Sequence, residues 1–454
     1  MGKRQIAGVG GIDRNCGMDQ EHRERRRGKL YRKIRLLFTG TVLLGAGIAG
    51  FYGYTMRQIP DKVSIVENRE ETMSLDLPFQ VTLQSESEEV ILGGNPAIPE
   101  DQITIIRNEP FQLKGKSQGN YQLGVDLFGM IRLKEIQVDV VETQYAIPCG
   151  TPVGIYLKAD GVMVIGTGKV TGENGETLEP AAGILKSGDY IEAINGKKLE
   201  TKEQLATAVS ELDGSEARLT VRRGEEHMEV AMDPVITEDG TGKLGIWVRS
   251  DTQGIGTMTY LDLNGRFGAL GHGISDSDTG ELVEISDGNL YDTRIVGIEK
   301  GSTGNPGVMS GVIYYGPGTM MGEITANTDQ GIFGQVNQRL KSQITSEPIE
   351  IGFHQEVKKG KAYIRSGVSG EIKDYEIEIM KVDESNIQDN KSLVLQVTDP
   401  ELLSLTGGIV QGMSGSPIIQ NGKLVGAVTH VLLSDPTKGY GISVETMLNT
   451  GEPA

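Results

Sequence analysis

A glycine-rich segment near the C-terminus has the composition of a turn that could hold a nucleophile. It reads "GGIVQGMSGSPIIQNGKLVGAVTHV" over residues 407–431 and places Ser414 and Ser416 among small residues. A β-hairpin turning at Asn421-Gly422 accounts for the second half of the segment. It does not account for "GMSGSP", where glycines and a proline crowd around one serine. Such crowding suits a backbone whose N–H groups converge on an external atom, so we expect an active-site turn here.

A serine becomes nucleophilic near neutral pH when a general base accepts its proton, and histidine is the usual base. His272 stands in "GALGHGISD", between glycines and directly after an apolar run, so its ring has open space around it. His430 follows the predicted strand "LVGAVT" and is the rival base. His227 and His354 have the surroundings of ordinary strand residues.

The composition excludes several other kinds of chemistry. The chain has 454 residues, 63 of them glycine, and a net charge of −18, which favours two or three β-rich domains and argues against a nucleic-acid binder. Its two cysteines, Cys16 and Cys149, cannot form a disulfide framework. Histidines and cysteines with zinc-site spacing are absent from the sequence, so we expect neither a metal nor another cofactor.

The N-terminus predicts export across a membrane. A basic tail over 1–35, ending in "RERRRGKLYRKIR", precedes an uncharged stretch over 36–56. A stretch of this length can span a hydrocarbon core, which needs about 20 residues. Basic flanks stay in the cytoplasm, so everything beyond Arg57 is predicted to be exported. The stretch is either an uncleaved anchor or a signal peptide cleaved after Ala49.

The exported part divides into four segments. Residues 57–120 are polar and acidic, and we expect a linker with scattered short strands. Residues 121–145 alternate apolar and polar side chains, which predicts a small β segment. Residues 146–234 form the third segment. From 235 to 454, turn signals recur between short apolar runs, which predicts β-barrels or a sandwich.

The third segment resembles a PDZ domain. It combines strands, the sequence "GDYIEAINGKKL", a helical stretch "ETKEQLATAVSEL" and a closing hairpin. The resemblance implies that Val153, Gly154 and Ile155 form the loop that binds the C-terminal carboxylate of a peptide, which would add as a strand beside it. The alternative is a β-rich domain without a ligand.

The anchor, the PDZ-like segment and the C-terminal block together resemble the stage IV sporulation protein B peptidases. "GMSGSP" and "GHGISD" are similar to the nucleophile and base motifs of trypsin-like serine peptidases. The resemblance implies a mainly β chain with a C-terminal double β-barrel, Ser414 as nucleophile, His272 as base and Asp399 as third member of the triad. Backbone N–H groups of Gly412 and Ser414 are then expected to form the oxyanion hole.

Asp399 departs from the usual trypsin-like order, in which the aspartate lies about midway between base and serine. Here it lies one strand and a loop before Ser414, and Asp399-Pro400 is also a common helix-start pair. Without the resemblance, Asp276, Asp278 and Asp329 would be equal candidates.

The resemblance implies a sporulation signalling enzyme. We expect an anchored endopeptidase in the space between mother-cell and forespore membranes. It would cleave a membrane-bound regulator of an intramembrane protease, which then activates a late sigma factor, and it would also cleave its own segment 57–120. The alternative is an inactive adaptor whose PDZ domain clusters membrane proteins.

Overall fold

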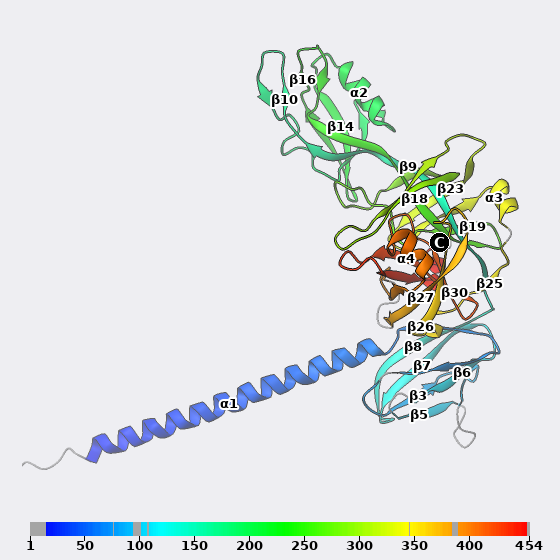
Figure 1. Cartoon of the computed structure of the whole chain (residues 1–454). Coiled ribbons are helices and arrows are strands. Elements are labelled where there is room, and N and C mark those ends of the chain that lie inside the picture. The colour runs from blue at the N-terminus through cyan, green and yellow to red at the C-terminus, as the bar shows by residue number, and fades with distance from the viewer. Residues whose placement is uncertain are drawn as a thin grey trace, which may run out of the picture.

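The computed structural model describes residues 15–75, 77–93, 101–106, 109–344, 346–383 and 389–451; the side chains of 15–34 and 343 are not described. Figure 1 shows a long helix, a β domain at the end of that helix, a central body rich in strands and an upper unit with one short helix. Strands outnumber helices throughout the described part, so the predicted mainly β fold is confirmed.

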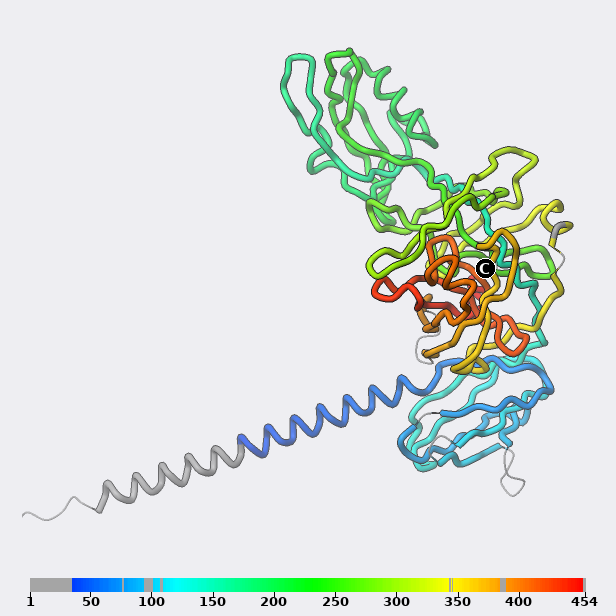
Figure 2. The backbone as a smooth tube through the Cα atoms, in the orientation of Figure 1, coloured from blue at the N-terminus to red at the C-terminus, as the bar shows by residue number. Residues whose placement is uncertain are grey.

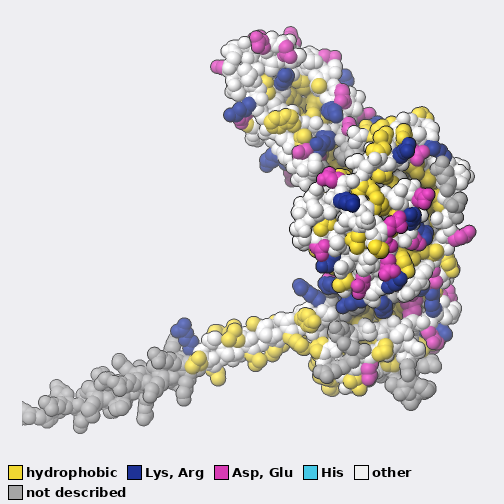
Figure 3. Space-filling view, viewed as in Figure 1, with side chains coloured by type: hydrophobic (Ala, Val, Ile, Leu, Met, Phe, Trp, Pro, Cys, Tyr) yellow, Lys and Arg dark blue, Asp and Glu magenta, His cyan; other side chains and the backbone are white. Residues whose placement is uncertain are grey.

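Helix α1 (Asn15–Gln58) runs directly into the β domain. Its segment Arg35–Gln58 is long and apolar enough to cross a membrane, and apolar side chains cover its exposed surface (Figure 3). Near its end, Thr55 becomes buried, and Ile59 belongs to the core of the β domain. The helix and the domain are therefore joined without a flexible connection.

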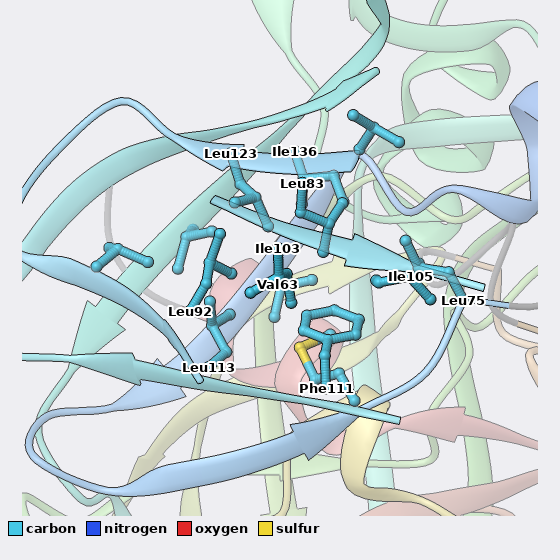
Figure 4. Close-up of a cluster of buried hydrophobic side chains, with 14 of the residues drawn as sticks. Val63, Leu75, Leu83, Leu92, Ile103, Ile105, Phe111, Leu113, Leu123 and Ile136 are labelled. Atoms are coloured by element: carbon cyan, nitrogen blue, oxygen red, sulfur yellow. The ribbon is translucent and has the colours of Figure 1, made fainter. Parts of the chain in front are cut away.

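Residues 62–141 form a two-sheet β domain, so the expectation of a linker over 57–120 and a separate β segment over 121–145 is wrong. Strands of the two sheets cover both sides of one apolar core (Figure 4). Of the acidic residues that suggested a linker, Glu70, Glu86 and Glu88 are exposed. Glu71 is instead a buried alternate of β2, where it accepts a hydrogen bond from the amide of Val66. The larger sheet has the order β1 (Lys62–Val66), β8 (Ile131–Val141), β7 (Gly119–Leu127), β3 (Val81–Ser85), β5 (Gln102–Ile105), and the smaller one β2 (Glu70–Met73), β6 (Phe111–Gly115), β4 (Val90–Gly93).

The upper unit has the strands and helix of a PDZ domain. Helix α2 (Lys202–Ser210) begins at Thr201, whose hydroxyl accepts a hydrogen bond from the amide of Gln204. Leu205 and Val209, one helical turn apart, lie in the core of the unit. Its other elements are β10 (Val170–Thr171), β11 (Thr177–Leu178), β12 (Tyr190–Ile194), β13 (Lys197–Lys198), β14 (Ala217–Arg223), β15 (Glu226–Met232), β16 (Val235–Ile236) and β17 (Gly242–Lys243).

Two long strands connect this unit to the central body. Strands β9 (Tyr145–Thr167) and β18 (Ile246–Asp262) pair with each other over almost their whole length. Their ends at 160–167 and 246–249 belong to the PDZ-like unit, whereas the remainder lies in the central body. Figure 2 shows the chain leaving the central body, tracing the upper unit and returning.

The first barrel of the central body closes through β9. The strand order is β9, β18, β19 (Arg266–Ala269), β24 (Gly331–Val336), β23 (Met320–Thr328), β20 (Ile285–Tyr291), and β20 pairs again with β9. The PDZ-like unit is therefore inserted between the first two strands of this barrel. The predicted boundaries of 146–234 and 235–454 are wrong, because β9 up to about residue 159 belongs to the peptidase.

The second barrel is contiguous in the sequence. It is a closed ring of β26 (Gly360–Ser366), β27 (Lys373–Val382), β28 (Leu393–Val397), β31 (Lys438–Ser443), β30 (Lys423–Val431) and β29 (Pro417–Gln420). The hairpin β21 (Thr293–Glu299) and β22 (Val308–Ile313) lies beside the two barrels. Smaller elements are β25 (Ile349–Glu350), α3 (Gln338–Gln343), the 3-10 turn His354–Glu356, α4 (Pro400–Thr406) and α5 (Val444–Gly451).

Candidate active site

His272 follows the last residues of β19, at the edge of the first barrel. The preceding Leu270 and Gly271 both have a φ of 69°, which turns the chain sharply out of the strand. The Nδ1 atom of His272 lies 2.8 Å from the carbonyl oxygen of Gly273. A carbonyl can only accept, so Nδ1 carries the proton, which leaves Nε2 free to act as a base.

Ser414 lies in the turn that leads into β29 of the second barrel. Gly412 and Gly415, on either side of it, have φ values of 100° and 94°. A Cβ on Gly415 would lie 2.0 Å from the carbonyl oxygen of Thr257, so only glycine fits there. The Oγ of Ser414 donates a hydrogen bond of 2.6 Å to the carbonyl oxygen of Thr429. In this structure, the hydroxyl of Ser414 is therefore bonded to a backbone carbonyl and not to His272.

Thr257 of β18 joins the two halves of the site. Its hydroxyl donates to the carbonyl oxygen of Gly412 at 2.8 Å, and its amide donates to that of Ser414 at 3.0 Å. Its own carbonyl accepts from the amide of Leu270, two residues before His272. Thr257 is fully buried. One threonine of the first barrel thus fixes the serine turn and the start of the histidine loop.

The two amides that were predicted to form an oxyanion hole belong to Gly412 and Ser414. Among the bonds found in the described residues, the amides of Gly412 and Ser414 donate to no protein acceptor, whereas those of Met413, Gly415 and Ser416 do. Met413 is buried in the core of the second barrel, which anchors the turn. Two free amides beside the serine can receive a developing oxyanion.

His272 and Ser414 face the same cleft, of about 540 Å³, between the two barrels. His430 lines it too, and the ring centroids of His272 and His430 lie 4.9 Å apart with an angle of 35° between the planes. Burial lowers the pKa of His272, partly opposed by the bond to Gly273. Burial, His272 and Lys391 lower the pKa of His430 to about 4. Both rings are therefore neutral near pH 7, as a general base must be.

The remaining histidines and the second serine lie elsewhere. His227 is exposed and contacts Glu192 in the PDZ-like unit. His354 is buried, with Nε2 3.2 Å from the carbonyl oxygen of Asp383. The Oγ of Ser416 is buried and, among the described residues, has no hydrogen-bond partner. These positions suit structural roles, so of the two serines in the glycine-rich turn it is Ser414 that lines the cleft.

Asp399 is not brought to the cleft. It is the N-cap of α4, where its carboxylate oxygens accept from the amides of Leu402 at 3.0 Å and Glu376 at 3.3 Å. Within the described part of the chain, no hydrogen bond or ion pair joins it to His272. The third triad position implied by the family resemblance is therefore not formed in this geometry. Helix capping accounts for one carboxylate oxygen, and the amide of Glu376 in β27 accounts for the other.

The other aspartates considered from the sequence have their own partners. Asp276 and Asp278 both pair with Arg249. The carbonyl oxygen of Asp329 accepts from the side chain of Asn390. The carboxylate whose charge reaches His430 is that of Asp389, which acts to raise the pKa of that ring. No sequence signal distinguished Asp389, because it lies in a loop far from either motif.

The predicted carboxylate loop of the PDZ-like unit is wrong. Val153, Gly154 and Ile155 lie within β9, paired with β18 on one side, while Gly154 and Ile155 also pair with β20 on the other. Their backbone groups are paired with neighbouring strands of the first barrel and cannot bind a peptide carboxylate. The apolar–glycine–isoleucine pattern that suggested them also occurs at Leu244-Gly245-Ile246, directly before the edge of β18.

A groove of about 460 Å³ lies at this second position, between α2 and the start of β18. Among the described pairings, residues 246–248 pair with β9 alone, so their other edge faces the groove. Gly245 has a φ of 66° at the mouth of the groove. Lys169, Lys202 and Lys243 line it, and the first two are paired with Glu179 and Asp251.

Two six-stranded barrels with a serine turn on one and a histidine on the other define the class of trypsin-like serine peptidases. Residues 240–448 match the family model described as SpoIVB peptidase S55. This match, over slightly less than half of the chain, supports the predicted SpoIVB peptidase family and identifies a serine peptidase.

Other comparisons add less. The solved PDZ domain of the SdrC-like protein from Listeria monocytogenes aligns over 20% of this chain and 87% of its own length, with 23% identity and a TM-score of 0.17. Among curated proteins, no match was found.

Proposed function

We propose that this protein is a membrane-anchored endopeptidase that uses Ser414 and His272. The single observation that carries the proposal is that the two residues, one from each barrel, line the same cleft beside the free amides of Gly412 and Ser414. Helix α1 supports the anchored location.

The geometry supports a two-step acyl transfer. Ser414 Oγ leaves the Thr429 carbonyl and attacks the scissile carbonyl, while its proton passes to Nε2 of His272. The oxyanion takes hydrogen bonds from the amides of Gly412 and Ser414. His272 then returns the proton to the leaving amine, and water hydrolyses the acyl-enzyme by the same route.

The cleft favours an apolar residue on the acyl side of the scissile bond. Among the described residues, its lining is mostly aliphatic, with a few uncharged polar side chains such as Gln411, and its only ionisable side chains are the two histidines. The aliphatic residues are Ile155, Ile255, Leu270, Ile274, Ile409, Val410, Val431 and Leu433. A charged substrate side chain would lose hydration there without gaining a partner. We propose substrates with an extended segment centred on an apolar residue.

We propose a membrane-bound regulator of an intramembrane protease as the substrate, in the space between mother-cell and forespore membranes. The family and the anchor support this proposal. Self-cleavage within 57–120 stays a prediction, but the described strands there must unfold locally before they can enter a cleft. Comparing fragments of the full-length wild-type and Ser414→Ala proteins tests it, because self-made fragments require Ser414.

We propose that the groove between α2 and β18 binds peptide C-termini. An added strand would pair with residues 246–248, and its carboxylate would face the amides near Gly245 and the three lysines. Trp247 is the one tryptophan of the chain and lines this groove, so its fluorescence reports binding. A peptide with a free carboxylate should change the fluorescence at lower concentration than the same peptide amidated. Equal responses would contradict carboxylate recognition.

An inactive PDZ adaptor is the second candidate. It is favoured by the bond from Ser414 to Thr429 and by the position of Asp399 outside the cleft. A fluorophosphonate probe separates the two functions. Labelling of the wild-type chain but not of Ser414→Ala supports a working site. Absence of labelling in a folded wild-type chain supports the adaptor.

A further inference from the structure

The N-terminal β domain carries an exposed apolar tip next to the apolar helix. The turn between β7 and β8 reads Leu127-Phe128-Gly129-Met130-Ile131. Phe128 is 56% exposed, Met130 81% and Ile131 60%. Phe128 has a φ of 51°, so the backbone is bent to present this side chain at the tip. Three large apolar side chains on one short turn form a patch that water solvates poorly.

Strand register places this tip on the side from which α1 arrives. Strand β1 runs parallel to β8 and begins with Lys62 opposite Gln137. Residues 131–136 of β8 therefore extend beyond the start of β1, back along the helix. The ammonium group of Lys134 confirms the proximity, since it donates to the carbonyl oxygens of Ile59 at 2.6 Å and Met56 at 3.4 Å.

A contact between two aromatic rings shows how far along α1 the tip of the β domain lies. Phe79 lies with its ring centroid 6.0 Å from that of Phe51 in α1. The amide of Phe128 donates to the carbonyl oxygen of Gln80, the residue after Phe79. Phe51 lies five residues before Met56, or about 8 Å along the axis at the usual helical rise. If 36–56 spans the hydrocarbon core, Phe79 and the tip beside it reach the level of the bilayer interface.

We propose that the β7–β8 tip inserts into the lipid interface beside α1 as a second membrane contact. Apolar side chains continue from the helix onto the adjoining face of the domain (Figure 3). Aromatic and apolar side chains at this level are stabilised at the boundary between headgroups and acyl chains. Arg132 follows the tip but is paired with Asp126, Glu86 and Glu135, so within the described residues of this turn no unpaired cation is present to select anionic lipids.

The contact would orient the catalytic domain. The β domain is bound to the peptidase by hydrogen bonds from Ser64 to Glu445 and from Arg69 to Glu350. With α1 and the tip both in the membrane, the β domain cannot rotate about the helix axis. The cleft is then held at one orientation to the bilayer. The inference rests on the membrane anchoring in the proposed function and does not depend on catalysis.

Depth-dependent quenching of tryptophan fluorescence tests the contact. Full-length chain carrying Trp247→Phe and Met130→Trp is reconstituted into phosphatidylcholine vesicles with brominated acyl chains. We expect at least a twofold loss of emission relative to unbrominated vesicles. Leu263→Trp in the same background is the matched control, because Leu263 is 67% exposed on a turn of the first barrel. It should show no loss. Phe128→Trp is a second reporter in case Met130→Trp fails to fold, which circular dichroism checks.

The possible results distinguish failure of the tip contact from failure of membrane anchoring. Vesicle-bound protein whose Met130→Trp and Phe128→Trp reporters are both unquenched overturns the proposal. Blue-shifted but unquenched emission also overturns it, because the tip is then covered by another copy of the chain. Protein that does not float with the vesicles contradicts the anchoring, a different failure from loss of the tip contact.

Discussion

The two barrels of the peptidase are built from the chain in different ways. The second barrel uses one uninterrupted stretch from 360 to 443, and its serine turn and closing strands follow one another closely. The first barrel is split, because the PDZ-like unit is inserted between β9 and β18. The barrel that supplies His272 therefore depends on a pairing between residues about 100 positions apart, such as Val153 with Gly256.

This difference makes β18 the strand that connects three sites. Its first residues border the peptide groove, Gln253 to Ile255 line the cleft, and Thr257 holds the serine turn. The second barrel supplies Ser414, the proposed nucleophile, but relies on the first barrel for its placement. Disturbing the first barrel should therefore affect both halves of the site, whereas changes confined to the second should act on the serine alone.

The largest expected effect is loss of the nucleophile from the second barrel. Ser414→Ala should lower kcat/KM by several orders of magnitude, since the attacking oxygen is removed. Ser416→Ala is the matched control: its Oγ is buried without a partner among the described residues, so most activity should remain. Peptide hydrolysis with both purified variants checks this. An inactive Ser416→Ala and an active Ser414→Ala would reverse the assignment.

Loss of the base from the first barrel should have nearly the same effect. His272→Ala should be about as inactive as Ser414→Ala, and the double variant no worse, because the two groups act as a unit. His430→Ala should retain measurable activity, since the ring stacks on His272 from the second barrel. The same hydrolysis assay compares them. Full activity in His272→Ala would transfer the role of base to His430.

Thr257 tests the dependence of one barrel on the other. Thr257→Val removes the bond to Gly412, and a hydrogen bond of this kind is worth about 1 kcal/mol, so kcat/KM should fall up to about tenfold. Thr257→Ser should keep the bond and most of the activity. Thr259→Val is the control, because Thr259 is equally buried in the same strand and its hydroxyl has no partner among the described residues. Equal losses in the two valine variants would show only a general effect on the strand.

The difference between the contiguous second barrel and the split first barrel also explains which features could be predicted from the sequence. The hairpin turning at Asn421-Gly422 was predicted correctly because its sequence signals are local. The boundary of the first barrel was not, because β9 runs as one continuous strand where it passes between the two domains. Gly154 was misassigned for this reason: glycine allows both a carboxylate loop and close approach within a barrel, where a Cβ would lie 2.5 Å from Ile313. Thr257 had no local signal at all, since its partners are distant in sequence.

Asp399 should matter for stability more than for catalysis. Asp399→Ser keeps a side-chain acceptor at the N-cap of α4, so kcat/KM should stay within about threefold of wild type if capping is its role. Asp399→Ala should lower the free energy of unfolding by about 1 kcal/mol. Kinetics and urea unfolding measure both. A folded Asp399→Ser protein without activity would instead support the triad role that the family resemblance implies.

The pH profile offers the smallest and most specific test. His272 must be neutral to accept the proton, and burial lowers its pKa, so the acid limb of kcat/KM should lie below the ordinary value of 6.5. His430→Ala opens the cleft to water and should move that limb upward, towards 6.5.

The stability of the fold should also depend on pH. Burial lowers the pKa of His354 to about 4. Between pH 6.5 and about 4, the His354 ring is therefore protonated in the unfolded state but neutral in the folded state. Stability contributed by this neutral ring is complete above 6.5 and is lost as the pH falls towards 4. Initial rates must therefore be taken within seconds of a pH jump, with Trp247 fluorescence reporting whether the chain is still folded. A limb at or above 6.5 in the wild type, with the fold intact, would contradict a buried neutral base.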